Sequence, residues 1–238
     1  MQQQTFYDRL VRAYKKHPVT FILLSINTLM AIIASILSQS LFTYHSDVLI
    51  NLGALVPSLI TTQGEYYRLL TAMFLHGSIL HFLMNSYFLY IIGGFVEDLF
   101  GKVKYITIYM IAGLGSSVLV WLMSMNSNVP TIGASGALFG IMGALLILTY
   151  QRPLLFTPYG IRSIRSLVVI NVIFTFIAPN ISIYGHLGGF LTGIGLMYLM
   201  LPSIKGPKPR KEQKDDTHHG NYVIDADDVS DDDIYYTN

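Results

Sequence analysis

A serine held between glycines is the first candidate for chemistry in this chain. Ser135 lies in the stretch Thr131–Gly140, which reads TIGASGALFG and opens a long apolar run. Because Gly133 and Gly136 carry no Cβ, the backbone can turn tightly at the serine and another helix can approach it closely. The same spacing is typical of plain helix packing in membranes. Ser135 therefore becomes a candidate nucleophile only together with other polar residues at the same depth.

Imidazole and carboxamide groups are the next candidates. His81 and Asn85 are four residues apart in an apolar segment, so they share one helix face, and His76 lies shortly upstream. A polar side chain that faces lipid is costly, so these groups should face the bundle interior or a water-filled cavity. One such residue usually only links helices, but two on one face indicate a site.

A third polar group opens another glycine-rich segment. Gly189 and Gly193 follow His186 by three and seven residues and share its helix face. Such a stripe allows close packing against a helix with glycines of its own, and the serine segment offers them. Its matching glycines are Gly136, Gly140 and Gly143. We expect this packing to bring His186 to Ser135.

Composition identifies the class of protein that must position these groups. The chain has 238 residues, 52% hydrophobic and only 12% charged, with a mean hydropathy of +0.50, which indicates a membrane protein. The net charge of +1 is spread over the ends and a few loops, so no nucleic-acid partner is expected. The absence of cysteine excludes disulfides, thiolate metal sites and cysteine nucleophiles.

The apolar segments predict six membrane-spanning helices. Their expected ranges are 19–37, 81–96, 105–125, 135–150, 164–178 and a last one from Gly185 to about residue 202. The long connection 38–80 contains aromatics and leucines and is expected to be structured and partly interfacial. Arg68 could anchor it through backbone carbonyls, although a snorkelling surface arginine would show the same spacing.

The serine helix is too short for a full crossing. From Ser135 to Tyr150 it measures about 24 Å at 1.5 Å per residue, less than the hydrocarbon core of about 30 Å. The preceding loop must therefore dip inward, which places Ser135 below the outer surface at a helix N-terminus. Unpaired N–H groups and the positive end of the helix dipole favour a developing oxyanion there.

Charge at the ends and loops predicts the orientation. Basic residues are concentrated in segment 1–18, near Lys102 and Arg152, and in segment 203–238, whereas the links near Asn126 and Pro179 carry no charge. By the positive-inside rule both ends are expected in the cytoplasm, with residues 1–18 as a basic flank of an uncleaved first span. Residues 203–238 are expected to form a disordered charged tail.

Three motifs together resemble the rhomboid family of intramembrane serine proteases. They are Gly-Ala-Ser-Gly at Ser135, His-x-x-x-x-His-x-x-x-Asn at His76, and Gly-His-x-x-Gly-x-x-x-Gly at His186. The motif at His76 falls on the second expected span, that at Ser135 on the fourth and that at His186 on the sixth, and the resemblance covers about residues 19–202. Glu-Tyr-Tyr-Arg, which ends at Arg68, also resembles the family's first-loop signature, with Tyr67 where tryptophan is common.

The resemblance implies an all-α membrane protein, a six-transmembrane-helix rhomboid-like bundle with a long interfacial first loop. It implies that Ser135 is the nucleophile and that His186 is its general base and then the acid for the leaving amine. The expected spans contain no carboxylate to orient the imidazole, so a Ser-His dyad is expected rather than a triad. No cofactor or metal is implied.

The remaining site residues follow from the same resemblance. His81, Asn85 and the Ser135 backbone N–H would form the oxyanion hole, and His76 would bridge it to the outer loop. Phe139, where tyrosine is common, could stack on His186. The supporting positions are Gly133, Gly136, Gly189, Gly193 and Arg68, and Gly185 stands where alanine is common.

Hydrolysis also requires water and a substrate. The residues expected to line an outward-opening cavity are His76, His81, Asn85, Ser86, Ser135 and His186. The substrate would be a transmembrane segment of another membrane protein, unwound near its outer end, within the lipid bilayer of a bacterial cell. The first loop and the fifth span are candidates for lateral gating. The sequence does not fix the physiological substrate, the oligomeric state or the role of the acidic tail.

Three other classes of protein are alternatives to a serine protease. A catalytically inactive rhomboid-like binding protein or chaperone would share the fold, but such proteins generally lack the serine or the histidine. A transporter would more often show repeated halves or paired broken helices. A zinc protease using His76, His81 and His186 lacks the His-Glu-x-x-His signature, and its first two histidines are poorly spaced for one helix face.

Overall fold

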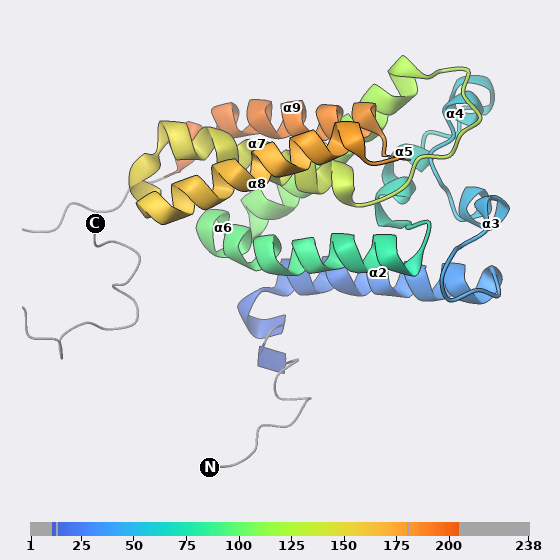
Figure 1. Ribbon diagram of the computed structural model, residues 1–238, viewed down its shortest axis with the longest axis horizontal. Helices are drawn as coiled ribbons and strands as arrows, with labels where there is room; N and C mark the ends of the chain where they lie inside the picture. The colour runs from blue at the N-terminus through green and yellow to red at the C-terminus, as the bar shows by residue number, and fades with distance from the viewer. Residues whose placement is uncertain (1–10, 13, 180, 205–238) are drawn as a thin grey trace, which may run out of the picture.

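The computed structural model describes residues 11, 12, 14–179 and 181–204, and these form a bundle of roughly parallel and antiparallel helices (Figure 1). Four of the helices are long and apolar enough to cross a membrane, and a shorter apolar helix covers Ser135–Gln151. The fold class predicted from the sequence is therefore confirmed. The expected charged tail from residue 205 and most of the basic N-terminal flank lie outside the described residues.

Helix α2, Pro18–Leu37, is the first span, and a buried carboxylate holds its N-terminus. Glu97 accepts hydrogen bonds from the backbone N–H groups of Val19 at 3.0 Å and Thr20 at 2.9 Å. It also accepts the Thr20 hydroxyl at 2.9 Å. The first N–H groups of a helix have no partner within the helix, and a negative group there also complements the dipole. Glu97 thereby fixes α2 against the helix that follows the first loop.

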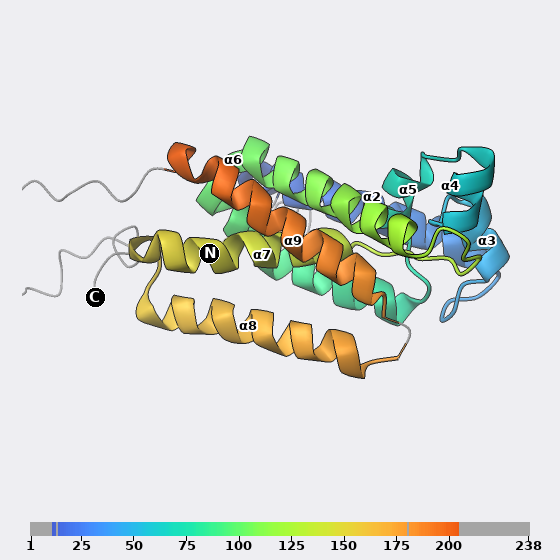
Figure 2. The same cartoon turned by 90° about the horizontal axis from the view of Figure 1, so that it is seen from above.

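That helix, α6, covers Ile79–Met123 and contains two spans joined at a glycine. Its 45 residues would extend about 68 Å if straight, more than twice the hydrocarbon thickness. Gly101 breaks it with φ 75° and ψ 163°, a conformation that suits only glycine. The chain reverses there, so the two halves lie antiparallel (Figures 1 and 2). The predicted second and third spans are confirmed. The connection between them, expected over residues 97–104, is shorter and consists of the break at Gly101.

The first loop is folded, as expected. It contains α3 Ser46–Asn51, α4 Pro57–Gln63, α5 Arg68–Thr71 and the 3-10 turn η1 Ala72–Phe74. Arg68 is only 4% exposed. Its guanidinium donates to the carbonyl of Ile50 at 2.6 Å and that of Ala54 at 2.9 Å, and it pairs with Glu65. The anchoring role is confirmed and the snorkelling alternative is wrong.

The serine and histidine helices pack through their glycines. Helix α7 covers Ser135–Gln151 and α9 covers Ile183–Met200, and they cross at close range (Figure 2). A Cβ on Gly189 would collide with the carbonyl of Gly136, and one on Gly193 would collide with that of Gly140. The predicted packing of the two glycine stripes is confirmed.

The fifth span begins earlier than predicted. Helix α8 covers Pro158–Ile177, whereas the sequence indicated a start at residue 164. The Thr157 hydroxyl caps it by accepting the Gly160 N–H at 3.0 Å. Arg165 can lie inside the helix because it donates to the end of α7, at the Thr149 carbonyl and hydroxyl, both 3.2 Å away. The neighbouring helix therefore accommodates Arg165 within the span.

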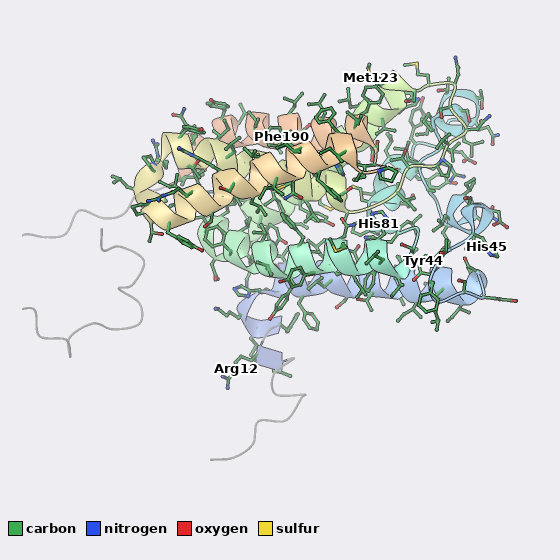
Figure 3. All side chains as sticks on the ribbon, in the orientation of Figure 1. Arg12, Tyr44, His45, His81, Met123 and Phe190 are labelled. Carbon is green, nitrogen blue, oxygen red and sulfur yellow. The ribbon has the colours of Figure 1, made fainter. Side chains whose placement is uncertain are left out.

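The two ends of the bundle differ. Lys104, just after the Gly101 turn, donates to the carbonyl of Ser203 at 2.8 Å, near the short 3-10 turn η3 Leu201–Ser203. His17, before α2, lies 3.0 Å from Asp98. The start of α2, the Gly101 turn and the end of α9 therefore share one end, and we call the opposite end, which bears α3 to α5, the loop end. Figure 3 shows His81 and Met123 there.

Candidate active site

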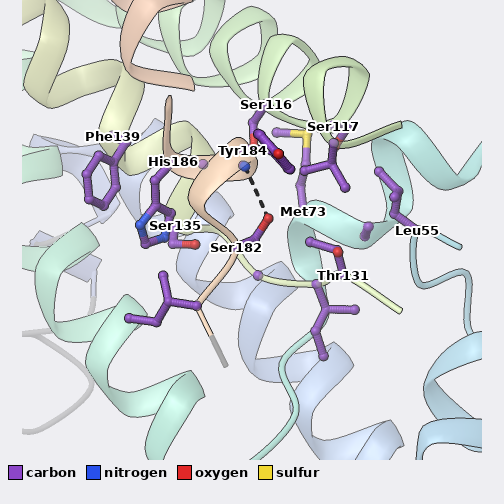
Figure 4. Close-up of a pocket in the computed structure, with 18 of the residues that line it drawn as sticks. Leu55, Met73, Ser116, Ser117, Thr131, Ser135, Phe139, Ser182, Tyr184 and His186 are labelled. Carbon is purple, nitrogen blue, oxygen red and sulfur yellow. Dashed lines mark hydrogen bonds between the residues drawn. The ribbon is translucent and has the colours of Figure 1, made fainter. Parts of the chain in front are cut away.

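A cavity of about 710 Å³ opens among α6, α7, α8 and α9 near the loop end (Figure 4). The predicted site residues that line it are His81, Asn85, Gly133, Ser135, Gly136, Phe139 and His186. Segments more than 100 residues apart in sequence thus contribute to one chamber. The structure brings together in this cavity four of the polar residues that sequence spacing singled out, namely His81, Asn85, Ser135 and His186.

The loop before α7 fixes the position of Ser135, the first residue of that helix. Thr131 exchanges two backbone hydrogen bonds with Leu55 in the first loop, at 2.8 and 3.1 Å, and Gly133 donates to the Ala72 carbonyl at 2.9 Å. Gly133 has a φ of +124°, a backbone conformation that residues with a side chain rarely adopt. The first loop therefore supports the serine directly through backbone contacts.

Unpaired backbone donors surround the serine. In α7 the Leu138 N–H donates to the carbonyl of Ala134 at 3.1 Å, which is the first turn of the helix. The N–H groups of Ser135, Gly136 and Ala137 precede that turn, so no helical carbonyl is in place to accept them. These donors and the positive end of the dipole lie at the cavity, as the length of the helix predicted.

His186 lies in the first turn of α9, and one aromatic ring stacks on its imidazole. Phe139, one turn after the serine, stacks on it with the ring centroids 3.9 Å apart and the planes 17° apart, as predicted. Figure 4 shows the Ser135 side chain beside the same imidazole. In the described part of the chain no direct hydrogen bond joins the two, and the His186 Nδ1 instead lies 2.8 Å from the hydroxyl of Thr175.

His81 and Asn85 point into the cavity from the start of α6. The backbone N–H of Gly77 donates to His81 Nδ1 at 3.4 Å. In a neutral imidazole the other nitrogen then carries the hydrogen, so Nε2 is a donor. A Cβ on Gly133 would lie only 2.9 Å from this Nε2, which places it beside the serine loop. The Asn85 amide donates one hydrogen to the His81 carbonyl at 2.9 Å, which leaves its second hydrogen available.

His76 and Ser86 do not line the cavity, so the predicted set was too large. His76 is only 1% exposed and packs edge-on against the His81 ring, with the two ring centroids 5.1 Å apart. Within residues 14–179, the two ring nitrogens of His76 have no hydrogen-bond partner, and the Ser86 hydroxyl has none either. Burial, and to a smaller extent the nearby His81, lower the pKa of His76 to about 3. His76 is thus a buried neutral support behind His81, because the loop turns back before α6 begins.

Several cavity residues escaped the sequence analysis. Polar side chains from α6 (Ser116 and Ser117) and from the start of α9 (Ser182 and Tyr184) line the cavity. Thr175 on α8 does not line it but contacts His186. A threonine or serine inside an apolar span usually bonds only to its own helix, so its type and spacing carry no signal. Across the described residues, no three His, Asp or Glu side chains converge to hold a metal ion.

Comparison with known proteins shows that the chain is similar to members of one family. A family model described as the Rhomboid domain matches residues 63–203. The chain is 34% identical over 178 residues to Rhomboid protease GluP of Bacillus subtilis, covering 75% of this chain and 34% of GluP. It is 36% identical over 158 residues to RHOMBOID-like protein 6, mitochondrial, of Arabidopsis thaliana, covering 66% of this chain and 50% of the Arabidopsis protein.

A shorter relative matches over nearly its whole length. Putative rhomboid protease YdcA of Bacillus subtilis is 27% identical over 194 residues, covering 81% of this chain and 92% of YdcA. By contrast, the chain spans only about a third to a half of GluP and the Arabidopsis protein. The matched part of the chain contains α6 to α9 and therefore both Ser135 and His186.

Proposed function

This chain belongs to the rhomboid family, and on that premise we propose that it is an intramembrane serine endopeptidase with a Ser135–His186 dyad. The observation that carries the proposal is the arrangement of the two side chains in one cavity. Ser135 begins α7 beside the His186 ring, which Phe139 holds by stacking at 3.9 Å. A hydroxyl, a neighbouring imidazole and a set of free N–H donors are the minimum for acyl transfer.

The proposed reaction has two halves. His186 takes the proton of the Ser135 hydroxyl as the oxygen attacks the carbonyl carbon of the scissile peptide bond. It then gives that proton to the leaving amine as the C–N bond breaks, which leaves an acyl-serine. Water, deprotonated by the same imidazole, attacks the ester and releases the new carboxyl terminus, and the proton returns to Ser135. Small shifts that align the dyad are expected when a substrate binds, because catalytic hydrogen bonds are often long in free enzymes.

Three donors are proposed to stabilise the oxyanion of each tetrahedral intermediate. They are the Ser135 backbone N–H, the Nε2–H of His81 and the free hydrogen of the Asn85 amide. The hydrogen bond from Gly77 to His81 Nδ1 supports the donor role of Nε2, since a neutral imidazole has only one hydrogen. Removal of one such donor typically lowers kcat by about a hundredfold or more.

The cavity supports a peptide substrate drawn from a membrane protein. About 710 Å³ with serine, histidine and asparagine side chains can hold water and an extended peptide. A helical segment has its carbonyls engaged in hydrogen bonds, so we expect cleavage where small or helix-weakening residues let it unwind. The first loop and α8, which has only three buried residues, remain our candidates for lateral access.

The orientation proposed is that both termini face the cytoplasm of a bacterial cell. Contacts between Lys104 and Ser203 and between His17 and Asp98 place the start of the first span and the end of the last at one side. The basic residues near Lys102 and at both ends of the chain favour the cytoplasm for that side. The loop end and its cavity would then open outward.

The test is cleavage of a single-span substrate by the purified protein in detergent micelles. We expect wild type to cleave and both Ser135→Ala and His186→Ala to be inactive while still folded. Ser25→Ala is the matched control, because that exposed hydroxyl bonds only to the Phe21 carbonyl of its own helix. Cleavage that survives Ser135→Ala would refute the dyad.

The alternative is a catalytically inactive rhomboid-like binding protein or chaperone. It predicts that wild type and Ser135→Ala bind the same transmembrane segment equally well and that neither releases product.

A zinc protease is distinguished by treatment with a chelator. A zinc protease would lose its activity on treatment, whereas the serine mechanism would not.

A further inference from the structure

A threonine on the fifth span contacts the proposed general base. Thr175 is in the last turn of α8 and is only 6% exposed, one of three buried residues in that helix. Its hydroxyl oxygen lies 2.8 Å from Nδ1 of His186. No other hydrogen bond to the His186 ring occurs among the residues that the structure describes.

The direction of this hydrogen bond follows from counting hydrogens. The Thr175 hydroxyl donates to the carbonyl of Asn171, four residues earlier, at 2.9 Å. A hydroxyl has one hydrogen, so while that hydrogen is donated to Asn171 the same oxygen accepts from His186. Nδ1 must therefore carry the hydrogen, and in a neutral imidazole Nε2 is then left with a lone pair.

This tautomer is the one that a general base at Ser135 requires. The lone pair on Nε2 is free to receive the serine proton, while Nδ1–H is held on the opposite edge of the ring. In serine proteases with three catalytic side chains, a carboxylate performs this positioning and favours the imidazolium. Here the acceptor is a neutral hydroxyl whose own direction is fixed by the α8 backbone. Phe139 restrains the plane of the ring, and Thr175 restrains its rotation within that plane.

We propose that Thr175 is a positioning residue that holds His186 in the Nδ1–H tautomer with Nε2 available to Ser135. The proposal rests on the proposed function but concerns a third side chain, from a helix outside the dyad. It also makes the general base dependent on where α8 sits, since displacement of α8 would remove the acceptor.

The first measurement is of the tautomer itself and needs no substrate. Protein labelled with 15N-histidine is studied by NMR in micelles at about pH 8, above the usual histidine pKa of about 6.5. His186→Gln identifies the His186 signals. We expect a protonated Nδ1 and an unprotonated Nε2 in wild type, and a mixture of the two tautomers in Thr175→Val, which keeps the shape and removes the acceptor.

The second measurement is kinetic. Thr175→Val should lower kcat about tenfold with KM changed by less than about twofold, because one neutral hydrogen bond is lost from the base and not from the substrate. Thr175→Ser should restore both the rate and the tautomer. The control is Thr28→Val, because Thr28 makes the same type of bond to its own helix, at 2.7 Å to Leu24, and is exposed.

The outcomes separate this proposal from the proposed function. It is overturned if wild-type His186 carries its hydrogen on Nε2, or if Thr175→Val changes neither the tautomer nor kcat. If Thr175→Val does not fold, the wild-type spectrum and Thr175→Ser still decide it. If wild type cleaves no substrate, the protease reading fails, whereas the tautomer assignment stands or falls on the spectrum alone.

Discussion

Replacement of Gly189 by alanine tests the contact that brings the two proposed catalytic helices together. A Cβ at this position would collide with the backbone carbonyl of Gly136, the residue after the serine. Backbone cannot rotate away as a side chain can, so α7 and α9 would have to separate by roughly 1 Å. Because Ser135 and His186 are on these two helices, the same shift would separate the nucleophile from its base.

The expected magnitudes come from two opposing effects. Overpacking costs about 1–3 kcal/mol, and the higher helix propensity of alanine returns up to about 1 kcal/mol, so the net loss of stability for Gly189→Ala is about 1–2 kcal/mol. Activity should fall far more, roughly a hundredfold in kcat/KM, because a misplacement of about 1 Å is that costly in catalysis.

Gly195 provides a matched control on the same helix. A Cβ added there meets nothing within 4 Å, so Gly195→Ala should keep full activity and gain up to about 1 kcal/mol in stability. Thermal unfolding and cleavage would be measured for both variants in the same detergent. Equal activity and equal unfolding temperatures for Gly189→Ala and Gly195→Ala would refute the inference that glycine packing aligns the dyad.

Three further predictions concern the supports of the site. Arg68→Ala should lower the free energy of unfolding by about 3 kcal/mol, because two buried backbone carbonyls lose their donor; a loss below about 1 kcal/mol in chemical denaturation would contradict this. His76 has a lowered pKa of about 3, so its contribution to stability is complete above pH 6.5 and declines as the pH falls. The decline amounts to about 2 kcal/mol between pH 6.5 and 4.5, and His76→Phe should remove that part of the pH dependence of unfolding; an unchanged profile would count against it. Gly133→Ala should lower kcat at least about tenfold, since φ +124° is strained for alanine and its Cβ would press on His81, whereas Gly77→Ala, which meets only one flexible methyl group at 3.4 Å, should cleave normally.

The spans and the glycine contacts were predictable because they depend on periodicity and size. Apolar length fixed the crossings, and the absence of a Cβ at Gly136 and Gly189 was enough to pair two helices. The shortness of the serine helix likewise indicated an inserted N-terminus at Ser135. The start of α8 was missed because its first turns precede the apolar run, although Thr157 and Pro158 form a capping pattern that could have located it.

The finer parts of the site depend on where side chains point. The sequence placed His76 in the cavity, but the chain turns before α6 and buries the ring behind His81. The role of Thr175 could not be predicted from the sequence, because a threonine in an apolar helix usually donates its hydroxyl to the carbonyl four residues earlier, as Thr175 does to Asn171. Only the fold reveals that the other side of that hydroxyl contacts His186.

The most direct test of the central claim is to identify the residue that becomes acylated or phosphonylated. A serine-reactive fluorophosphonate is incubated with the folded protein in micelles, and the modified peptide is identified by mass spectrometry. The proposed mechanism predicts a single adduct on Ser135 that is strongly reduced in His186→Ala and absent in Ser135→Ala. An adduct on another serine, or labelling of Ser135 at the same rate without His186, would contradict the assignment of this pair as nucleophile and base.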